Sequence, residues 1–315
     1  MTKKIPTIVK QIQKHKLLEI DYRTQKNISF SQLQMYSQCP WKWDLVYRQG
    51  HKIYQPSIHT VFGKAFHETV QNWLTVMYEQ TGVEADKIDL EEYLLEKIKH
   101  HYQDEYQGTG KTHFSTKEEL NEFYQDGVAI LREIKKNRAA YFGRKGWYLV
   151  GVELPLLIEP NPEYKNIIYK GYLDLVLYHE PSEEFYILDF KTSTRGWDDK
   201  TKKDEMKQAQ LILYKEYYHK QFGVDRDKIN VKFLIVKRKI WEQSEYVQRR
   251  VQEYIPPSGP IKTKKVLAIM DEFIKNCYNQ DGSIKDTQHC KNPSDSNCKF
   301  CPFKDRGDLC DRGQK

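Results

Sequence analysis

Two aspartates and one lysine lie in or beside apolar segments, where they could carry out metal-assisted hydrolysis. Asp174 lies within the apolar segment 167–178, and Asp189 follows the apolar run Phe185–Leu188, with Lys191 two residues later. Hydrolysis of a phosphodiester requires carboxylates that hold a divalent cation and a positive group that stabilises the developing charge. These three residues therefore form a candidate catalytic set.

Three consecutive antiparallel strands are predicted around this set, because Val, Ile, Leu, Tyr and Phe dominate each segment. A polar turn near Pro181 joins the second strand to the third, which brings Asp174 and Asp189 to the same end of the sheet. There the two carboxylates can share one Mg²⁺. The predicted strands are 147–158, 167–178 and 185–191.

The third strand is expected to hold Lys191 and Asp189 on one face, since residues two apart on a strand point to the same side. Phe190 then faces the core, and its backbone carbonyl could add a metal ligand. Gly171 removes a side chain where a scissile phosphate has to approach. A structural ion pair without catalysis is the competing interpretation of Asp189 and Lys191.

Two predicted helices offer further polar side chains to this end of the sheet. Gln210 and Tyr214 are four residues apart, with Tyr217 one turn further, so the three form a polar and aromatic face able to touch a phosphate or a base. His67 could offer an imidazole to the metal, which favours Mn²⁺ alongside Mg²⁺. A structural histidine is the alternative at this position.

The order of the predicted elements indicates an α/β fold with a mixed sheet flanked by helices, preceded by a large helical part. Predicted helices cover 29–47, 61–79, 90–106, 117–142, 202–222 and 262–278, and a fourth strand covers 229–237. The expected divisions are a loosely held polar arm (1–28), a helical part (29–146), a core of sheet and helix (147–260), and a helix with a cysteine-rich tail (261–315).

Composition favours a soluble protein that binds a polyanion. The formal net charge is +7, and 22 tyrosines and 6 tryptophans offer flat faces on which unpaired bases could stack. At 39% hydrophobic residues the chain is expected to fold. No segment approaches the roughly 18 apolar residues of a membrane span, and the N-terminal segment does not resemble a signal peptide, so we expect a cytoplasmic protein without membrane contact.

Most of the six cysteines gather near the C-terminal end. A cytosolic location disfavours disulfides, and the Cys298-x-x-Cys301 spacing lets neighbouring thiolates reach one centre. The cluster therefore indicates an iron-sulfur or other metal centre.

Five motifs follow one another in an order that resembles the PD-(D/E)XK nuclease superfamily. They are most similar to its RecB-type branch, which includes the nuclease domains of RecBCD and AddAB enzymes, exonuclease V and the CRISPR-associated adaptation nucleases. The resemblance covers residues 29–310. The motifs are Gly63-x-x-x-His67, Glu153, Gly171-x-x-Asp174, Asp189-x-Lys191 and Gln210-x-x-x-Tyr214.

This resemblance implies a restriction-endonuclease-like core and a role for each motif. Lys191 would position the attacking water and stabilise the developing charge, and Gln210 and Tyr214 would organise the site and contact DNA. Glu153 matches an additional acidic residue of some relatives, and a solvated strand carboxylate is its alternative interpretation. The implied ligands of Mg²⁺ or Mn²⁺ are His67, Asp174, Asp189 and the carbonyl of Phe190.

The iron-sulfur members of this branch join one early cysteine to three late ones around a [4Fe-4S] cluster. A long gap between Cys301 and Cys310 and the extra thiol of Cys290 depart from that pattern. They leave open a Zn²⁺ site that uses Cys290 or His289, and a metal-free packed loop is a third interpretation. The set that matches the cluster ligands is Cys39, Cys298, Cys301 and Cys310.

The expected activity is metal-dependent DNA hydrolysis, exonucleolytic on single strands or ends, in recombination, repair or phage DNA metabolism. A Walker-type phosphate loop is missing from the sequence, so a helicase partner would be a separate chain. Two alternatives stay open: a structure-specific endonuclease on the same fold, and a DNA-binding module that has lost cleavage.

Overall fold

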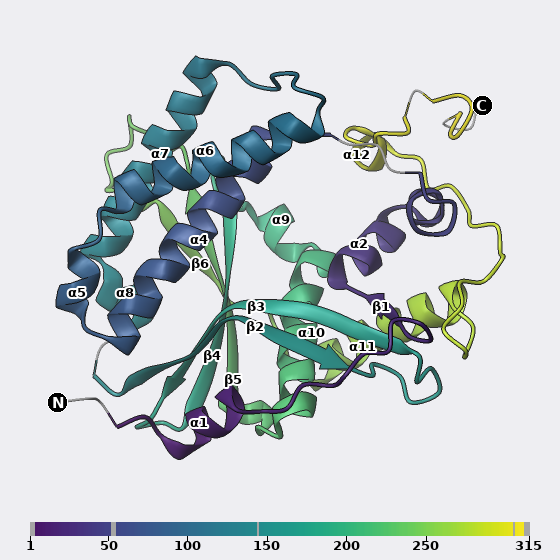
Figure 1. Cartoon of the computed structure of the whole chain (residues 1–315), viewed down its shortest axis with the longest axis horizontal. Helices are drawn as coiled ribbons and strands as arrows, with labels where there is room; N and C mark the ends of the chain where they lie inside the picture. Colours follow the sequence, from purple (N-terminus) through teal and green to yellow (C-terminus); the bar gives the residue numbers. More distant parts are fainter. Residues whose placement is uncertain (1–3, 52–54, 144, 305, 312–315) are drawn as a thin grey trace.

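A mixed β-sheet runs through the protein, with helices on both of its faces (Figure 1). The computed structural model describes residues 4–51, 55–143, 145–304 and 306–311. Strands β2, β3 and β4 are consecutive and antiparallel, β4 and β5 are parallel, and β6 pairs antiparallel with β5. The strands are β1 (Lys26–Ile28), β2 (Trp147–Ile158), β3 (Ile167–His179), β4 (Glu184–Ser193), β5 (Ile229–Lys237) and β6 (Val251–Tyr254).

One face of the sheet is covered by helices that precede the strands in the sequence. Phe62, Phe66 and Trp73 of the long helix α4 are buried in one core with Leu175 of β3 and Phe190 of β4. These side chains recur at helical spacing, so they form one buried apolar stripe along the helix that was predicted over 61–79. The helices of this layer are α4 (Ile58–Glu79), α5 (Gly82–Asp86), α6 (Leu90–Gly108), α7 (Lys117–Lys136) and α8 (Arg138–Phe142).

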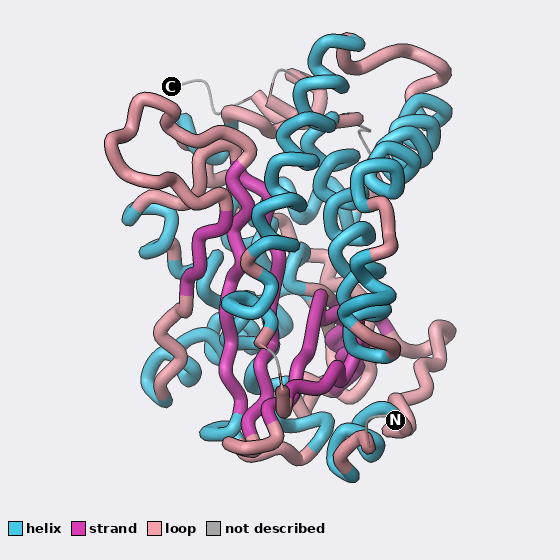
Figure 2. Tube along the Cα trace, turned by 90° about the vertical axis from the view of Figure 1, so that its left-hand side faces the viewer, coloured by secondary structure: helices cyan, strands magenta, loops and turns pink. Residues whose placement is uncertain are grey.

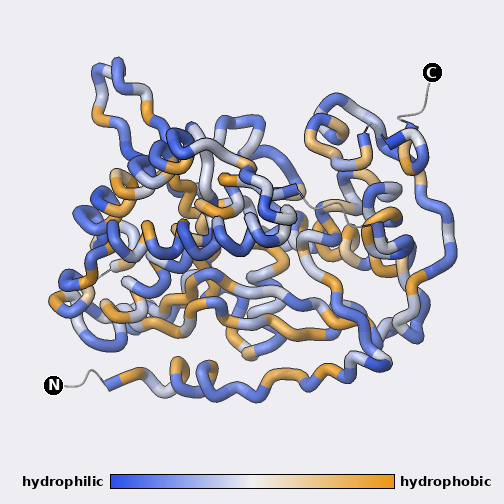
Figure 3. Tube along the Cα trace, turned by 45° about the horizontal axis from the view of Figure 1, so that its top comes forward, coloured by the Kyte–Doolittle hydropathy of each residue, from blue (hydrophilic) through white to orange (hydrophobic). Residues whose placement is uncertain are grey.

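The other face is covered mainly by helices that follow the strands. Leu211 of α10 and Phe273 of α11 lie in a second core with Ile187 of β4 and Phe233 of β5. Figure 2 shows the strands side by side between these helices, and Figure 3 shows apolar stretches in both extended and helical segments of the chain. The elements are α2 (Phe30–Gln38), α9 (Asp199–Lys203), α10 (Glu205–Phe222), the 3₁₀ turn η2 (Arg226–Lys228) and α11 (Pro260–Cys277).

The expectation of a loosely held N-terminal arm is wrong for two parts of it. Helix α1 (Thr7–Gln13) buries Val9 and Ile12 against the core, and β1 pairs in parallel with the start of β3. Two apolar side chains and a short strand pairing therefore hold this polar segment to the sheet. The division of the chain into four segments stays a prediction.

Several predicted helices are broken by local sequence signals. Pro40 begins a new short helix, so the helix predicted over 29–47 becomes α2, α3 (Pro40–Trp43) and the π-helix η1 (Asp44–Arg48). The Asp204 side chain caps α10, accepting from the backbone N–H groups of Met206 and Lys207, which separates α9 from α10.

Strand β6 was absent from the prediction because it is short and depends on pairing with β5. The helix predicted over 117–142 likewise divides into α7 and α8 at Asn137. Among the described helices, none combines the length and the apolar character that crossing a bilayer requires.

Candidate active site

Strands β3 and β4 pair along part of their length and then separate. The last paired residues are Leu175 and Leu188, so Asp174 and Asp189 occupy the next positions, where the ladder ends. The backbone N–H of Phe190 is thereby free to donate to Asp174 Oδ2 at 2.8 Å. We call this point, formed by Asp174 and Asp189, the fork. The sequence prediction that a hairpin brings the two carboxylates to one end of the sheet is confirmed.

Asp189 is held between a lysine and a glutamine. Lys191 Nζ lies 2.7 Å from Asp189 Oδ2, and Gln210 Nε2 donates to Asp189 Oδ1 at 3.1 Å. The side chain of Asp189 is only 2% exposed, against 32% for Lys191. Asp189 Oδ2 accepts no well-directed hydrogen bond from any described residue. Its partner is thus the ammonium group of Lys191, which compensates the charge of this buried carboxylate.

His67 approaches the fork from α4. Its Nδ1 lies 3.5 Å from Asp174 Oδ2, and its ring packs edge-on against Phe190 with 5.8 Å between centroids. His67 is thus beside Asp174, whereas Asp189 is turned toward Lys191 and Gln210. The ligand atoms of His67, Asp174 and Asp189 do not all lie within 4.8 Å of one another.

Burial and neighbouring charges shift the pKa values of the ionisable groups at the fork. Burial raises the pKa of both Asp174 and Asp189 to about 6, and Lys191 opposes this rise. Burial lowers the pKa of His67, so its imidazole is more readily neutral and available as a ligand. For Lys191, burial acts to lower the pKa, but the two carboxylates outweigh it and the net change is upward. Lys191 is therefore a permanent cation.

Glu153 of β2 stands opposite Asp174, since its neighbours Val152 and Leu154 pair with Leu175 and Leu173. It has a φ of 48°, a conformation that a non-glycine residue seldom adopts in a strand. The negative charge of Glu153 acts to raise the pKa of Asp174. Glu153 is exposed, so its interpretation as a solvated strand carboxylate stays open beside that of an additional acidic site residue.

Gln71 is a site residue that the sequence prediction missed. Its Nε2 donates to Glu153 Oε1 at 2.7 Å and to the Asp174 carbonyl oxygen at 3.2 Å, and Gln71 is 6% exposed. It therefore ties α4 to β2 and β3 behind the fork. Its spacing of four residues from His67 was the available signal, because such residues share a helix face.

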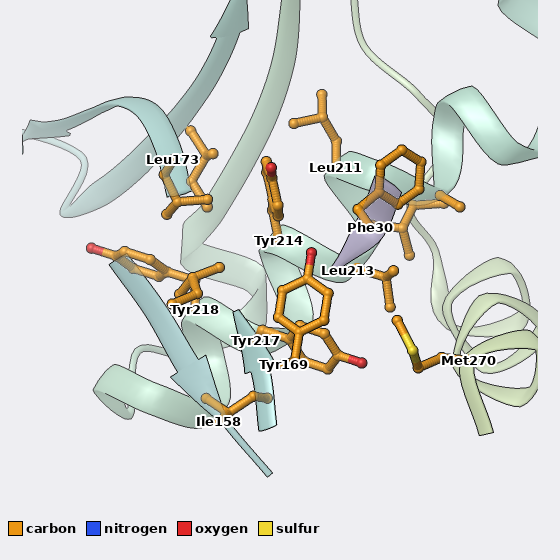
Figure 4. Packing of buried hydrophobic residues seen from close by; sticks show 14 of the residues in the cluster. Phe30, Ile158, Tyr169, Leu173, Leu211, Leu213, Tyr214, Tyr217, Tyr218 and Met270 are labelled. Carbon is orange, nitrogen blue, oxygen red and sulfur yellow. The ribbon is translucent and has the colours of Figure 1, made fainter. Parts of the chain in front are cut away.

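Helix α10 confirms one part of its predicted face and contradicts another. Gln210 Nε2 lies 3.1 Å from the Tyr214 hydroxyl oxygen, so these two residues meet beside Asp189. Tyr217 does not reach the site: it is fully buried, with its ring 4.5 Å from that of Tyr169 (Figure 4). The prediction that it touches a phosphate or base is wrong, because one further helical turn points it into the core.

Gly171 also differs from its expected role. A Cβ built at this position would lie 3.0 Å from Cε1 of Tyr169 and 3.4 Å from Cε1 of Tyr214. The space next to Gly171 is thus filled by two tyrosine rings, and the glycine allows close packing there.

The donor set at the fork fits a divalent cation. Two carboxylates, an additional carboxylate at Glu153 and a neutral imidazole are oxygen-rich ligands with one nitrogen, which suits Mg²⁺ or Mn²⁺. Burial raises the pKa of Asp174 and Asp189 even though Lys191 lies beside Asp189 Oδ2. A divalent cation would add to the positive charge that Lys191 supplies there.

Four cysteines from the two ends of the chain line one cavity, which we call the cysteine cavity. Hydrogen bonds close it: Trp41 Nε1 donates to the Leu309 carbonyl at 3.0 Å, and Asn297 Nδ2 donates to the Gln38 carbonyl at 2.9 Å. In Figure 1 the C-terminal segment with α12 (Asp295–Cys298) lies near this early part of the chain. The four cysteines are Cys39, Cys298, Cys301 and Cys310.

The remaining candidates for a tail metal lie outside the cavity lining. Cys290 is exposed, Cys277 is buried in the sheet core, and the His289 ring packs at 5.5 Å from Tyr36 and 5.4 Å from Trp43. No three thiols of described cysteines lie within 4.8 Å of one another. The four cavity thiols are thus spread around a space.

Comparison with known proteins agrees with this geometry. No curated protein matches the chain in sequence. The family model of the PD-(D/E)XK nuclease superfamily matches residues 27–306, which include the fork, His67, Gln210 and three of the four cavity cysteines. A match over nearly the whole chain shows that this protein belongs to the PD-(D/E)XK nuclease superfamily, a group of phosphodiester-cleaving hydrolases that typically use Mg²⁺ or Mn²⁺.

Proposed function

We propose that this protein is a metal-dependent DNA nuclease whose catalytic centre is the fork. The observation that carries the proposal is the meeting of partly buried Asp174 and buried Asp189 with Lys191, at the point where two strands separate. A purely structural ion pair accounts for Asp189 with Lys191, but not for a second carboxylate and an imidazole beside them.

The proposed ligands of Mg²⁺ or Mn²⁺ are drawn from four positions. His67 Nδ1 lies 3.5 Å from Asp174 Oδ2, and Asp189 supplies a carboxylate that also pairs with Lys191. The backbone carbonyl of Phe190 is the fourth proposed ligand, and Glu153 is a further carboxylate near the centre. When bound, the cation neutralises phosphate charge and lowers the pKa of the attacking water.

The protein's own residues supply positioning and charge. Lys191 holds the attacking water and stabilises the negative charge that develops on the phosphate oxygens. Gln210 fixes the orientation of Asp189 through its bond to Oδ1, and Tyr214 supports Gln210. Gln71 braces Glu153 and the Asp174 backbone from behind. These contacts keep the carboxylates in place while substrate exchanges.

We place the protein in the RecB-like branch, as an exonuclease that acts on single-stranded DNA or DNA ends. The order of its motifs and the position of its cysteines support this placement. This placement implies a role in recombination, repair or phage DNA metabolism. Any helicase would be a separate partner chain.

For the cysteine cavity, we propose a [4Fe-4S] cluster. Zinc bound to sulfur at about 2.3 Å would draw its thiolates to less than about 4 Å from one another. The thiols here are spread more widely, which suits the larger centre better. Lys42 and Lys291 also line the cavity, and their positive charges favour thiolates.

Degradation of end-labelled linear and circular single-stranded DNA, with and without Mn²⁺, tests the proposal. We expect Mn²⁺-dependent loss of linear DNA while circles stay intact. Cleavage of circles would favour the structure-specific endonuclease instead. Binding without any cleavage, in Mg²⁺ or Mn²⁺, would show an inactive DNA-binding module.

A further inference from the structure

A pocket of about 340 Å³ adjoins the fork and is shared by three parts of the chain. Lys191 and Gln210 form its inner wall, so it begins where the proposed chemistry takes place. Phe30 and Gln34 of α2 line a second side. Trp197, between β4 and α9, and Lys207, in the first turn of α10, complete it, and we call it the flanking pocket. Its volume is within the range of small-ligand sites.

Trp197 is fixed in this pocket by contacts to the edge of the sheet. Its backbone N–H donates to Gln252 Oε1 at 2.8 Å, and Gln252 Nε2 donates back to its carbonyl oxygen at 3.0 Å. The indole packs on Phe233, with 4.9 Å between ring centroids. Gln252 lies on β6 and Phe233 on β5, so the indole is a preorganised surface rather than a mobile side chain.

The turn between Ser193 and Trp197 also has a constrained backbone. Gly196 has a φ of 93°, and its backbone N–H donates to Ser193 Oγ at 3.1 Å. A Cβ at Gly196 would lie 2.9 Å from Lys237 Cδ and 3.0 Å from Gln252 Oε1. Glycine is therefore required for the chain to pass from the end of β4 to Trp197.

The charge of the pocket favours an anion. Lys191 and Lys207 both line it, and no described residue in its lining is acidic. Lys207 Nζ lies 5.2 Å from the centroid of the Trp197 ring, and no carboxylate of a described residue is within 4.0 Å of it. An aromatic face next to an available ammonium group is the combination that binds a base and its phosphate.

We propose that the flanking pocket holds one unpaired nucleotide next to the scissile phosphate, with its base against Trp197 and Phe30 and its phosphate against Lys207. This inference rests on the proposed nuclease function and specifies its substrate. A volume of about 340 Å³ suits one nucleotide, so we expect a paired base to leave its partner before it enters. The substrate class is therefore single-stranded DNA or a frayed end, and intact duplex is excluded at this position.

Equilibrium binding in EDTA tests the pocket without any cleavage. A fluorescent oligothymidylate and a blunt duplex of equal length are titrated by anisotropy. Trp197→Ala should weaken oligothymidylate binding about ten- to a hundred-fold, as expected for the loss of one stacked base, and change duplex binding far less. Trp197→Phe should retain most of the affinity. Lys207→Ala should weaken binding and make its salt dependence less steep.

Matched controls separate the pocket from general effects. Tyr22, an aromatic residue that is 62% exposed, and Lys203, an exposed lysine of α9, both lie outside the pocket lining and should tolerate alanine without loss of binding. Gly196→Ala should reproduce the Trp197→Ala defect, because it displaces the indole without altering Lys191 or Gln210. Near-ultraviolet circular dichroism of each variant verifies the fold.

The outcomes distinguish this inference from the proposed function. If Trp197→Ala binds oligothymidylate as well as the original protein does, or loses single-strand and duplex binding equally, the pocket proposal is overturned. If single-strand binding depends on Trp197 but no metal supports cleavage, the pocket stands and the nuclease proposal fails.

Discussion

The fork and the cysteine cavity are the two chemical centres of this protein, and they are assembled by different means. The fork brings together Asp174 and Asp189, close in sequence, through regular strand pairing. The cysteine cavity brings Cys39 to Cys298 from opposite ends of the chain through a few side-chain bonds to loops, such as that from Trp41 to Leu309. The fork is therefore part of the core, whereas the cavity is closed by fewer contacts and would gain stability from the cluster that we propose there.

Because of this difference, we expect the residues that carry the proposed catalysis to be distinct from those that join the two ends of the chain. Substitutions at the fork should change chemistry with little effect on folding. Substitutions at the cavity should change stability first, and activity only through it.

The largest effect is expected at the fork. Lys191→Ala and Asp189→Asn should each lower the cleavage rate by about a thousand-fold, because transition-state charge stabilisation is lost. DNA binding and the circular dichroism spectrum should change little. Single-turnover cleavage of labelled DNA in Mn²⁺ measures the rate, and unchanged turnover in either variant would remove that residue from the mechanism.

At the cavity the effect should be on stability. Cys298→Ser should abolish iron binding by anaerobically purified protein and lower the unfolding temperature by about 5 °C. Cys290→Ser is the matched control, because Cys290 is exposed and outside the cavity lining, and it should retain iron. Iron content and thermal unfolding measure both effects. Stoichiometric zinc in place of iron would contradict the cluster.

A smaller effect concerns how the stability of the fork depends on pH. Asp189 has a pKa raised to about 6 in the folded protein, above its usual 3.8, so its contribution to stability is complete below about pH 4 and is lost as pH rises through about 6. In EDTA, Asp189→Asn should therefore gain stability relative to the original protein, by about 4 °C between about pH 5 and 8. Mn²⁺ should reverse this difference. Parallel pH dependences of the two proteins would contradict it.

The smallest effect concerns the strain at Glu153. Because its φ is 48°, Glu153→Gly should be more stable than Glu153→Ala by about 0.5–1 kcal/mol. Urea unfolding of the two variants measures this difference. Equal stabilities would mean that the backbone at this position carries no strain.

Much of the core was predictable because its signals are local. Strands 147–158 and 229–237 have the predicted bounds. The apolar run before Asp189 was enough to place it in a buried strand, although β4 continues beyond it to Ser193.

Other features depend on contacts between segments far apart in sequence. The burial of Tyr217 follows from packing against Tyr169, and the docking of β1 follows from an available edge of β3. Gln71 acts through hydrogen bonds to Glu153 and Asp174 on other elements, and the position of Trp197 is fixed by hydrogen bonds with Gln252. No periodicity within one segment carries such information.

Direct measurement of metal binding at the fork tests the central proposal. Isothermal titration of Mn²⁺ into the purified protein in the absence of DNA should show binding that is lost in both Asp174→Asn and Asp189→Asn, while Cys298→Ser, at the other centre, retains it. Mn²⁺ affinity that is the same in the two aspartate variants as in the original protein would contradict the proposal that the fork holds the catalytic metal.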